Sequence, residues 1–265
     1  MKIVVLVKSV PDTESKIKIA GDGLSIDPAG IKFVLNPYDE YAVEEGLRIR
    51  ERLKDDTTVA VISMGPDRVV EVLRTALAMG ADDAVHVNDP AFEGGDSCAN
   101  ARVLAEAVRL LGPDLILGGK QGIDDDLSSM GAAIAEHLGI PQAQIVTELT
   151  LADDRKSVIA RRRVEGADEL VEMSLPALVT CDKGLNEPRY ASLPGIMKAK
   201  KKEIRRVALA DLPLKPEQVG AAGSATRLVK YHGLPERPPV KMIQGDAATQ
   251  AKELARLLRE EAKVI

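Results

Sequence analysis

A glycine-rich, acidic segment is the part of the sequence best suited to hold a small anion. It spans residues 118–126, reads GGKQGIDDD and runs into an expected helix near Leu127. Glycines let a backbone approach a phosphate closely, and the first amides of a helix can donate to it. Asp124, Asp125 and Asp126 would repel a phosphate, so we expect one or more of them to cap the helix or to face a ribose hydroxyl. A nucleotide-binding loop and a plain capped loop both fit this pattern.

A second segment, Asn186–Lys202, combines residues that could dock another protein. It reads NEPRYASLPGIMKAKKK, with apolar side chains between two prolines and a glycine, followed by a run of lysines. These helix-breaking residues argue against a regular element up to Gly195. An exposed apolar tip beside cations suits an anchor with electrostatic steering. A buried loop followed by a solvated helix fits the composition as well.

Residue types that carry catalysis or hold metals are scattered. His86, His137 and His232 are isolated, and none lies beside a candidate nucleophile. Cys98 and Cys181 have no metal-like spacing. The sequence contains no GxxxxGK[ST] motif, and no GxGxxG follows the first expected strand, which disfavours a Mg-dependent NTPase and ordinary dinucleotide binding. We therefore expect a protein that binds molecules, with no catalytic residue and no metal site.

Strands and helices alternate around the first segment. The expected strands are Ile3–Val7, Thr58–Met64, Ala84–Val87 and Asp114–Leu117. The expected helices are one opened by Asn36 and Pro37, then Arg68–Met79, Ser97–Leu111 and Leu127–Leu138. This repetition predicts an α/β fold with a doubly wound, mostly parallel sheet and helices on both faces. Ligands of such sheets bind beyond the carboxyl ends of the strands, where Val7–Val10, residues 64–66 and residues 118–126 would lie.

The second half has a different pattern. Period-two stretches predict an antiparallel extension at the sheet edge, formed by Gln144–Leu151, Ser157–Val164 and Glu169–Ser174 before a short buried strand at Leu178–Thr180. From Asp211 to Gly245 the chain is rich in Pro and Gly, which indicates an extended arm, and Ala247–Lys263 closes it as an amphipathic helix. We expect a nucleotide-binding α/β domain over residues 1–210, which includes the segment 186–202, and an arm over residues 211–265 that packs on a partner. A helix packed back on its own sheet fits the pattern equally.

Composition narrows the class of protein. The 265 residues carry a net charge of -5 and include two Phe, four Tyr and no Trp. Such a chain has neither the positive charge nor the stacking aromatics that nucleic-acid binding requires. The apolar run before Lys8 fits a buried strand better than a signal peptide or a membrane span, and two unpaired cysteines suit a reducing compartment. We expect a cytoplasmic protein that contacts no nucleic acid and does not insert into a membrane.

Five segments resemble the electron-transfer flavoprotein beta (small) subunits, and the resemblance covers nearly the whole chain. They are LNPYDEYAVEEGLR at Leu35–Arg48, RTALAMGAD at Arg74–Asp82, GKQGIDDD at Gly119–Asp126, VEGADELVEMSLPALVT at Val164–Thr180 and NEPRYASLPGIMKAKKK. The last two form the family's signature region. The resemblance implies a heterodimer with an alpha subunit that carries FAD. Such a complex takes electrons from acyl-CoA-type dehydrogenases and passes them toward a quinone oxidoreductase, and this subunit is an electron carrier that binds AMP structurally.

The resemblance also implies residue roles. The AMP pocket would comprise Leu6, Asn36, Met64, Gly119, Lys120, Gln121, Gly122, Asp125, Asp126, Leu127, Ser128, Ser129 and Met130, with Gly122 and residues 125–129 nearest the phosphate. The recognition loop would present Tyr190, Leu193, Pro194, Ile196, Met197, Lys198 and Lys200, with Leu193 as the anchor that enters the dehydrogenase. Lys198 and Lys201 match lysines that can be methylated in the family, and Thr13 takes the place of a tyrosine near the partner's flavin.

Two departures from the family pattern keep an alternative open. The family's phosphate loop has Asn-Gln-Thr where this chain has Ser128, Ser129 and Met130; the hydroxyls can donate to a phosphate, whereas Met130 cannot. A Val-Pro-Asp-Thr start, here Val10–Thr13, also occurs in the electron-bifurcating branch, whose beta subunit holds a second FAD in place of AMP and oxidises NADH. The acids at Asp124–Asp126 and the LPGIMKAKKK ending favour AMP.

Overall fold

The computed structural model describes residues 1–233 and 239–265, which fall into two compact units. The first unit contains Met1–Lys18 and Ile26–Val229. The second contains Ile19–Ser25 and the described residues of Lys230–Ile265. Both segments that could bind or dock lie in the first unit.

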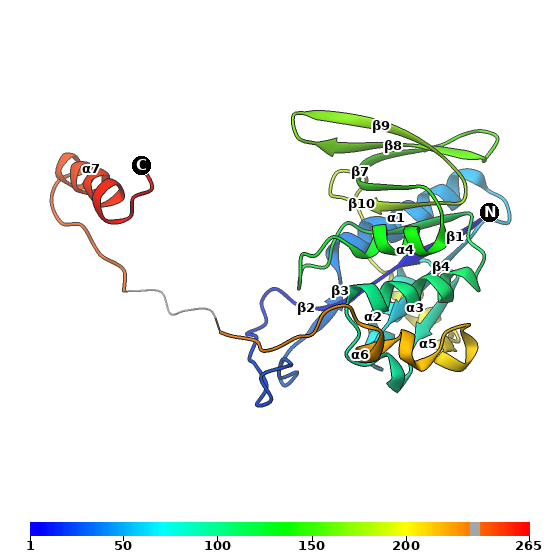
Figure 1. Cartoon of the computed structure of the whole chain (residues 1–265). Helices are drawn as coiled ribbons and strands as arrows, with labels where there is room; N and C mark the ends of the chain where they lie inside the picture. The colour runs from blue at the N-terminus through cyan, green and yellow to red at the C-terminus, as the bar shows by residue number, and fades with distance from the viewer. Residues whose placement is uncertain (234–238) are drawn as a thin grey trace. The chain divides into compact units, whose positions relative to one another are not determined.

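A mixed sheet forms the centre of the first unit (Figure 1). Within the described residues it has nine strands, in the spatial order β11 (Arg205–Val207), β5 (Asp83–Val87), β4 (Thr58–Met64), β1 (Lys2–Leu6), β6 (Leu115–Gly119), β10 (Ala177–Cys181), β7 (Gln142–Leu151), β8 (Ser157–Val164) and β9 (Ala167–Ser174). All pairs from β11 to β7 are parallel, and the two last pairs are antiparallel. The expected parallel sheet and its antiparallel extension are both confirmed.

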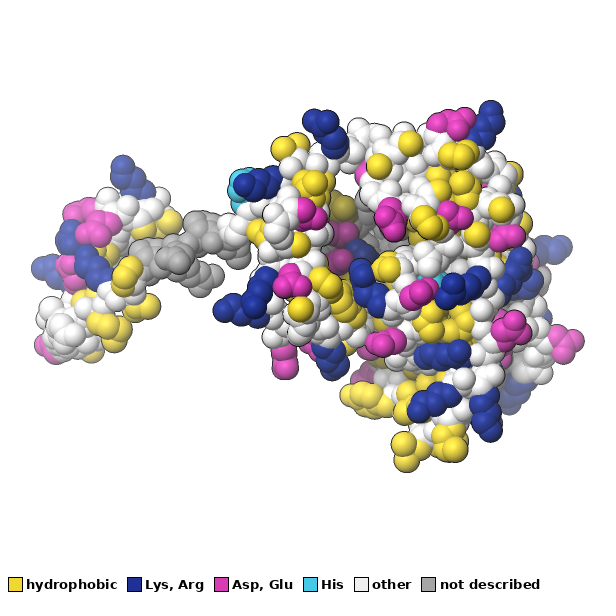
Figure 2. All heavy atoms as spheres, turned by 90° about the horizontal axis from the view of Figure 1, so that it is seen from below, with side chains coloured by type: hydrophobic (Ala, Val, Ile, Leu, Met, Phe, Trp, Pro, Cys, Tyr) yellow, Lys and Arg dark blue, Asp and Glu magenta, His cyan; other side chains and the backbone are white. Residues whose placement is uncertain are grey.

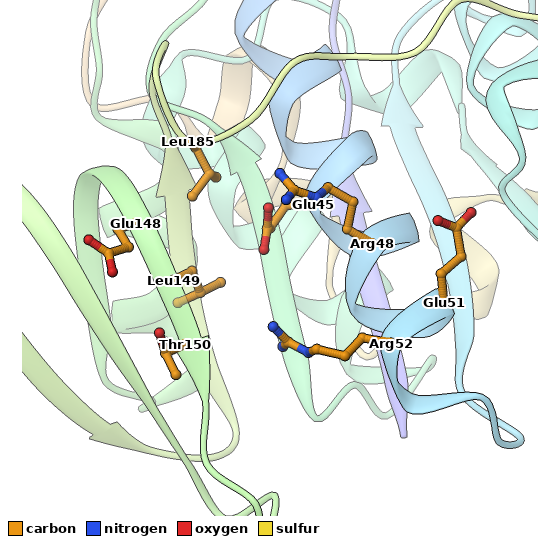
Figure 3. Close-up of a pocket in the computed structure, with 8 residues that line it drawn as sticks. All are labelled: Glu45, Arg48, Glu51, Arg52, Glu148, Leu149, Thr150 and Leu185. Carbon is orange, nitrogen blue, oxygen red and sulfur yellow. The ribbon is translucent and has the colours of Figure 1, made fainter.

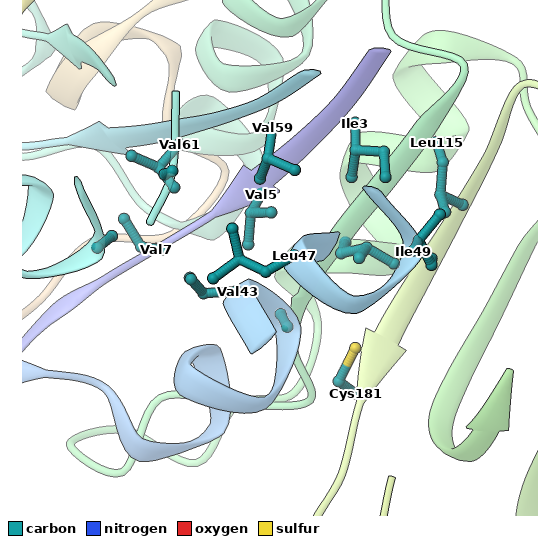
Figure 4. Close-up of a cluster of buried hydrophobic side chains, with 14 of the residues drawn as sticks. Ile3, Val5, Val7, Val43, Leu47, Ile49, Val59, Val61, Leu115 and Cys181 are labelled. Carbon is teal, nitrogen blue, oxygen red and sulfur yellow. The ribbon is translucent and has the colours of Figure 1, made fainter. Parts of the chain in front are cut away.

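Helices cover both faces of the parallel part, because successive side chains of a strand point to opposite faces. Ile3 and Val5 of β1 belong to a core with α1 (Pro37–Leu53) and α2 (Val69–Met79), and Figure 4 shows Leu47 of α1 packed beside Val5. Val4, between them, belongs to a second core with α3 (Ser97–Arg109) and α4 (Met130–Leu138). The chain is therefore doubly wound, as its sequence predicted.

The helix ends follow local rules. Pro37 opens α1, where its missing N–H has no helical partner to lose, and Lys54 ends the helix with a left-handed φ of 51°. Gly80 ends α2 with a φ of 133°, which few other residues adopt. Asp96 caps α3 by accepting a hydrogen bond from the Ala99 N–H.

Three short strands were not predicted. β2 (Ser9–Pro11) and β3 (Phe33–Leu35) pair antiparallel outside the main sheet, and β11 extends that sheet beside β5. Each has only three residues. A strand of that length contains too little alternation to be seen in the sequence.

The chain after β11 contains more helix than the expected extended arm. Leu209–Asp211 and Pro216–Gln218 are 3-10 turns, and Gly220–Gly223 is a short helix, α6, that contacts α3. In the second unit, α7 (Ala247–Arg256) continues into a π-helical turn at Leu257–Glu261. No described residue of α7 is buried. The domain boundary at residue 210 and the packing of residues 211–265 on a partner stay predictions.

Candidate functional site

The acidic glycine loop lies where the strand order reverses. The chain runs outward from β1 through β4 to β5 and then returns to place β6 on the other side of β1. Crevices beyond the carboxyl ends at such a switch are the usual ligand sites of open α/β sheets. The segments that leave β1 and β6 here are Val7–Val10 and residues 120–129. The fold therefore brings two of the three expected segments to the switch, and the third, residues 64–66, lies at the end of β4, the other neighbour of β1.

Two buried side chains, Asn36 and Asp39, tie these segments together. Asp39 accepts hydrogen bonds from the backbone N–H of Lys8 at 2.6 Å and of Gly119 at 3.0 Å. Asn36 donates from Nδ2 to Asp39 at 2.9 Å and to the Gln121 carbonyl at 2.9 Å. Its Oδ1 accepts from the Ile123 N–H at 3.2 Å. The start of α1 thus fixes the ends of β1 and β6 and the loop beyond β6.

Asn36 was predicted as a contact of the nucleotide pocket, and in the structure its side chain bonds to the protein's own loop and to Asp39. Its side chain is engaged with the protein itself, and the residue is only 1% exposed. Asp39, which the sequence analysis missed, is its partner, and burial raises the pKa of that carboxyl to about 7. An acid in the first turn of a helix is common, because it complements the helix dipole. Nothing in the sequence distinguished Asp39 from an ordinary surface acid.

The three acids of the loop do not cap the next helix, which was one of the two expected roles; the other, contact with a ribose hydroxyl, stays a prediction. Lys8 Nζ pairs with Asp124 at 2.7 Å and with Asp125 at 2.8 Å, and Asp126 accepts from Gln121. α4 begins at Met130 rather than near Leu127, and Ser129 takes the N-cap position. The loop is longer because Asp126 and Ser128 adopt left-handed φ angles of 50°, which interrupt a helical path.

Lys120, the other cation of the loop, is also committed to a carboxylate. Its Nζ lies 3.0 Å from Asp182 and 4.8 Å from the centre of the Tyr38 ring. Burial alone would lower the pKa of Lys120, but Asp182 outweighs burial and raises it. Neither Lys8 nor Lys120 is therefore placed as a free cation for a phosphate. Any anion here would depend on backbone N–H groups, such as those of the first turn of α4, which lack helical acceptors.

The predicted glycines serve the protein's own contacts. A Cβ on Gly119 would lie 2.3 Å from Asp39 Oδ1, and one on Gly122 would lie 2.5 Å from Asp124 Oδ1. Both positions need glycine because side chains of the site approach the backbone closely. The phosphate that the sequence analysis invoked for these glycines is not required to explain them.

Apolar members of the predicted pocket lie on one side of the sheet. Leu6, Met64 and Met130 are partly buried and pack against the core shared with α3 and α4. Leu6 and Met64 end the neighbouring strands β1 and β4, and Met130 begins α4, whose first N–H groups lack helical acceptors. Apolar side chains and free backbone donors suit an apolar base and a charged group of one ligand. Leu127 and Ser129 are exposed, while Ser128 donates to the Lys120 carbonyl at 2.9 Å. Ser63, next to Met64, has a buried hydroxyl with no partner among the described residues, but it points to the opposite face of the sheet, which α1 and α2 cover. The features that fit a nucleotide are the apolar side chains and the free N–H groups at the start of α4.

The docking segment is more regular than predicted. Helix α5 (Leu193–Lys201) starts before Gly195, because Ser192 caps it by accepting from the Gly195 N–H and Pro194 lies in its first turn. Gly195 faces α2 closely: an added Cβ would lie 2.4 Å from the Ala78 carbonyl oxygen. The expected irregular segment ends at Ser192, and only the expectation for residues 193–195 was wrong.

An apolar surface is exposed on this segment, as predicted. The exposed fractions are 97% for Tyr190, 79% for Leu193, 66% for Met197 and 38% for Ile196. Pro194, Lys198 and Lys200 are exposed as well. Figure 2, viewed from the side on which α5 lies in Figure 1, shows hydrophobic and cationic side chains next to one another. Thr13 is exposed just after β2.

A separate polar cavity of about 460 Å³ lies between α1 and β7 (Figure 3). Charged side chains dominate its lining, which consists of Glu45, Arg48, Glu51, Arg52, Glu148, Leu149, Thr150 and Leu185. None of the predicted site residues lines it. Among the described residues, no set of three potential metal ligands gathers, and no helix is long and apolar enough to cross a membrane.

Known proteins resemble the chain over most of its length. Residues 23–212 match the electron transfer flavoprotein domain. Electron transfer flavoprotein subunit beta of Methylophilus methylotrophus is 39% identical over 98% of both chains, and that of Bacillus subtilis is 41% identical over 100% of both. Subunit CarD of the caffeyl-CoA reductase-Etf complex of Acetobacterium woodii is 37% identical over 98% of both.

Proposed function

The chain belongs to the electron transfer flavoprotein family as a beta-type electron carrier, and we propose that it holds AMP structurally and works in a heterodimer with an FAD-bearing alpha subunit. FAD supplies the redox chemistry when bound in that complex. The observation that carries the proposal is the loop over residues 119–130 at the switch of the sheet, whose backbone is fixed by Asn36 and Asp39. No catalytic side chain of this subunit is invoked.

The AMP part of the proposal is supported by the partly buried apolar side chains at the ends of β1 and β4 and by the free N–H groups at the start of α4. Leu6, Met64 and Met130 would hold the base, and N–H groups around Ser129 and Met130 would hold the phosphate. Asp125 and Asp126 are on the rim, where they suit ribose hydroxyls better than phosphate oxygens. Lys8 compensates part of their charge.

The partners follow from the two remaining surfaces. Tyr190, Leu193, Ile196 and Met197 would enter an acyl-CoA-type dehydrogenase, and Lys198 and Lys200 would steer it. The electrons would continue to a quinone oxidoreductase. Helix α7, whose Leu254 is 49% exposed, would pack on the alpha subunit. Thr13 would face the flavin of that subunit. Cys98 and Cys181 are free thiols, which fits the reducing cytoplasm as the proposed location.

A second function is favoured by one specific observation, the similarity to CarD. In that alternative, the subunit holds a second FAD in place of AMP and oxidises NADH in an electron-bifurcating complex. Ser128, Ser129 and Met130, which depart from the family's Asn-Gln-Thr, support it, while the acids at Asp124–Asp126 favour AMP.

A cofactor count on the heterodimer, purified from its own host and then denatured, tests the proposal. One FAD with one AMP per heterodimer is the expected result. Two FAD without AMP would establish the bifurcating alternative. A chain that copurifies with no flavin-bearing subunit would overturn both.

A further inference from the structure

We propose that Arg189 is the positioning residue that holds the docking segment on α1 in the conformation that meets the dehydrogenase. The inference rests on the docking role proposed above. Arg189 itself is not among the residues expected to touch the dehydrogenase. It precedes Tyr190, the most exposed large apolar residue of the segment.

Arg189 binds two glutamates of α1 at once. Its Nε and Nη2 donate to the two oxygens of Glu44 at 2.7 and 3.0 Å, and its Nη1 and Nη2 donate to Glu51 at 2.6 and 3.0 Å. Its backbone N–H also donates to Glu44 at 3.2 Å. Residues 44 and 51 lie on the same face of the helix, because seven residues make about two turns. The planar guanidinium matches this fork, which an ammonium group cannot do.

Burial distinguishes this contact from an ordinary surface ion pair. The Glu44 side chain is 7% exposed and that of Arg189 is 34% exposed, while Glu51 is 51% exposed. An ion pair on the surface contributes little to stability, whereas a buried carboxylate that loses its cationic partner leaves an unpaired negative charge in the interior, which is strongly destabilising. Glu44 therefore restricts where Arg189, and with it the start of the docking segment, can lie.

Further contacts fix both ends of the same segment. Asn186 donates from Nδ2 to the Tyr41 carbonyl and to Glu45, each at 3.0 Å. At the other end, Lys202 donates to the Ala81 and Asp82 carbonyls of the turn after α2, at 2.8 and 2.7 Å. The apolar side chains between these ends have no such polar contacts of their own. A segment held at its ends and exposed in the middle is preorganised for binding, which lowers the ordering cost on association.

The helix α1 also offers a control. Figure 3 shows Arg52 projecting from α1 on a different side from Glu51. Arg52 is exposed and forms no ion pair within residues 1–233 and 239–265. Substituting Arg52 by Lys repeats the chemical change of Arg189→Lys on the same helix, away from the Arg189 contact.

The test compares Arg189→Lys, the double variant Glu44→Gln/Glu51→Gln, Arg52→Lys and Leu193→Ala in the intact heterodimer. Two quantities are measured: amide hydrogen exchange over residues 186–197 without the dehydrogenase, and the KM and kcat for reduction by the dehydrogenase. We expect Arg189→Lys and the double variant to speed exchange and to raise KM about tenfold, with kcat nearly unchanged, because only a fraction of molecules would hold the competent conformation. Arg52→Lys should change neither quantity.

Each other outcome is decisive. Unchanged exchange and KM in Arg189→Lys would show that the contact does not position the segment. Faster exchange with unchanged KM, while Leu193→Ala raises KM, would overturn the positioning role and leave the docking function standing. If Leu193→Ala also left KM unchanged, the docking function itself would fall. Lysine keeps the charge, so Arg189→Lys remains informative even where Arg189→Ala fails to fold.

Discussion

Asn36 donates from its side-chain amide to Oδ1 of Asp39 across 2.9 Å, and this buried pair joins three segments of the chain. Asp39 accepts hydrogen bonds from the N–H groups of Lys8 and Gly119, and Asn36 donates one to the Gln121 carbonyl in the loop beyond β6. Both residues belong to the start of α1, so a single helix terminus ties together the segments that follow β1 and β6. Asn36 and Asp39 therefore hold the backbone of the loop over residues 119–130 at the switch of the sheet.

Asp39 should make stability depend on pH. Burial raises its pKa in the folded state to about 7, above its ordinary value of 3.8. Between these two pKa values the folded state binds the proton more tightly than the unfolded state. The contribution of Asp39 to the free energy of unfolding is therefore greatest below pH 3.8, falls as the pH rises toward 7, and stays constant above 7. The loss is on the order of 1–3 kcal/mol between pH 5 and 8.

Asp39→Asn tests this prediction, because asparagine does not titrate. The variant should be less stable than the parent at pH 5, where an N–H loses its acceptor, and the difference should shrink toward pH 8. Urea unfolding at several pH values measures it. A difference that stays constant over this range would contradict the assignment. Glu45, whose pKa is also raised by burial, is present in both proteins and cancels in the comparison.

Lys8→Met should weaken the retention of AMP. The substitution leaves the backbone bond from Lys8 to Asp39 in place but removes the cation between Asp124 and Asp125. Two uncompensated carboxylates would then add negative charge beside the anionic nucleotide, and we expect about a tenfold weaker affinity for AMP at low salt. Equilibrium dialysis of the heterodimer against labelled AMP measures it.

Restoring the charge balance should restore binding. In the triple variant Lys8→Met/Asp124→Asn/Asp125→Asn, AMP affinity should return toward that of the parent. Lys32→Met, which removes an exposed cation paired with Asp12, should change nothing. If Lys8→Met bound AMP as tightly as the parent, the loop acids would have to lie away from the nucleotide.

Patterns that repeat over many residues were read correctly from the sequence. The apolar run predicted as a strand at Ile3–Val7 lies, except for Val7, in the central strand β1 (Lys2–Leu6), and the period-two stretches after Gly139 form β7, β8 and β9. Burial on both faces of a parallel strand demands such a run, and burial on one face demands alternation. The doubly wound fold follows from these repeated constraints.

Features set by one or two tertiary contacts were not predictable. β11 exists because three residues add to the edge of β5, and α5 starts at Leu193 because Ser192 caps it against α2. One or more of the acids at Asp124–Asp126 were expected to cap the helix or to face a ribose hydroxyl, and the pairing of Asp124 and Asp125 with Lys8, more than a hundred residues earlier, was not foreseen. A pattern read over a few neighbouring residues cannot predict an ion pair with a residue so distant in sequence.

Gly195→Ala should destabilise the first unit. The added Cβ would lie 2.4 Å from the Ala78 carbonyl oxygen of α2 and 3.1 Å from Ser192 Oγ. A backbone oxygen inside a helix cannot move aside, so α5 must shift, at a cost of about 1–3 kcal/mol. Thermal unfolding measures the change. Gly21→Ala is the control, because its Cβ would meet no atom within 4 Å; equal effects of both substitutions would show that α5 does not pack on α2 as described.

Leu193→Ala should impair electron transfer from the dehydrogenase without affecting assembly. The Leu193 side chain is 79% exposed at the first position of α5, so truncation removes little buried area from the subunit itself. If it fills a pocket of the dehydrogenase, the loss is about 2 kcal/mol, equivalent to a roughly thirtyfold increase in KM. The AMP and FAD contents of the heterodimer should equal those of the parent.

Leu170→Ala supplies the matched comparison for that result. Leu170 is 67% exposed on β9, and its truncation should leave KM unchanged. Similar increases in KM in both variants would mean that exposed leucines affect binding of the dehydrogenase without occupying a specific pocket. Loss of assembly in Leu193→Ala would mean that the side chain packs inside the heterodimer, and the dehydrogenase would then have to bind elsewhere, since the anchor of α5 would already be covered by the alpha subunit.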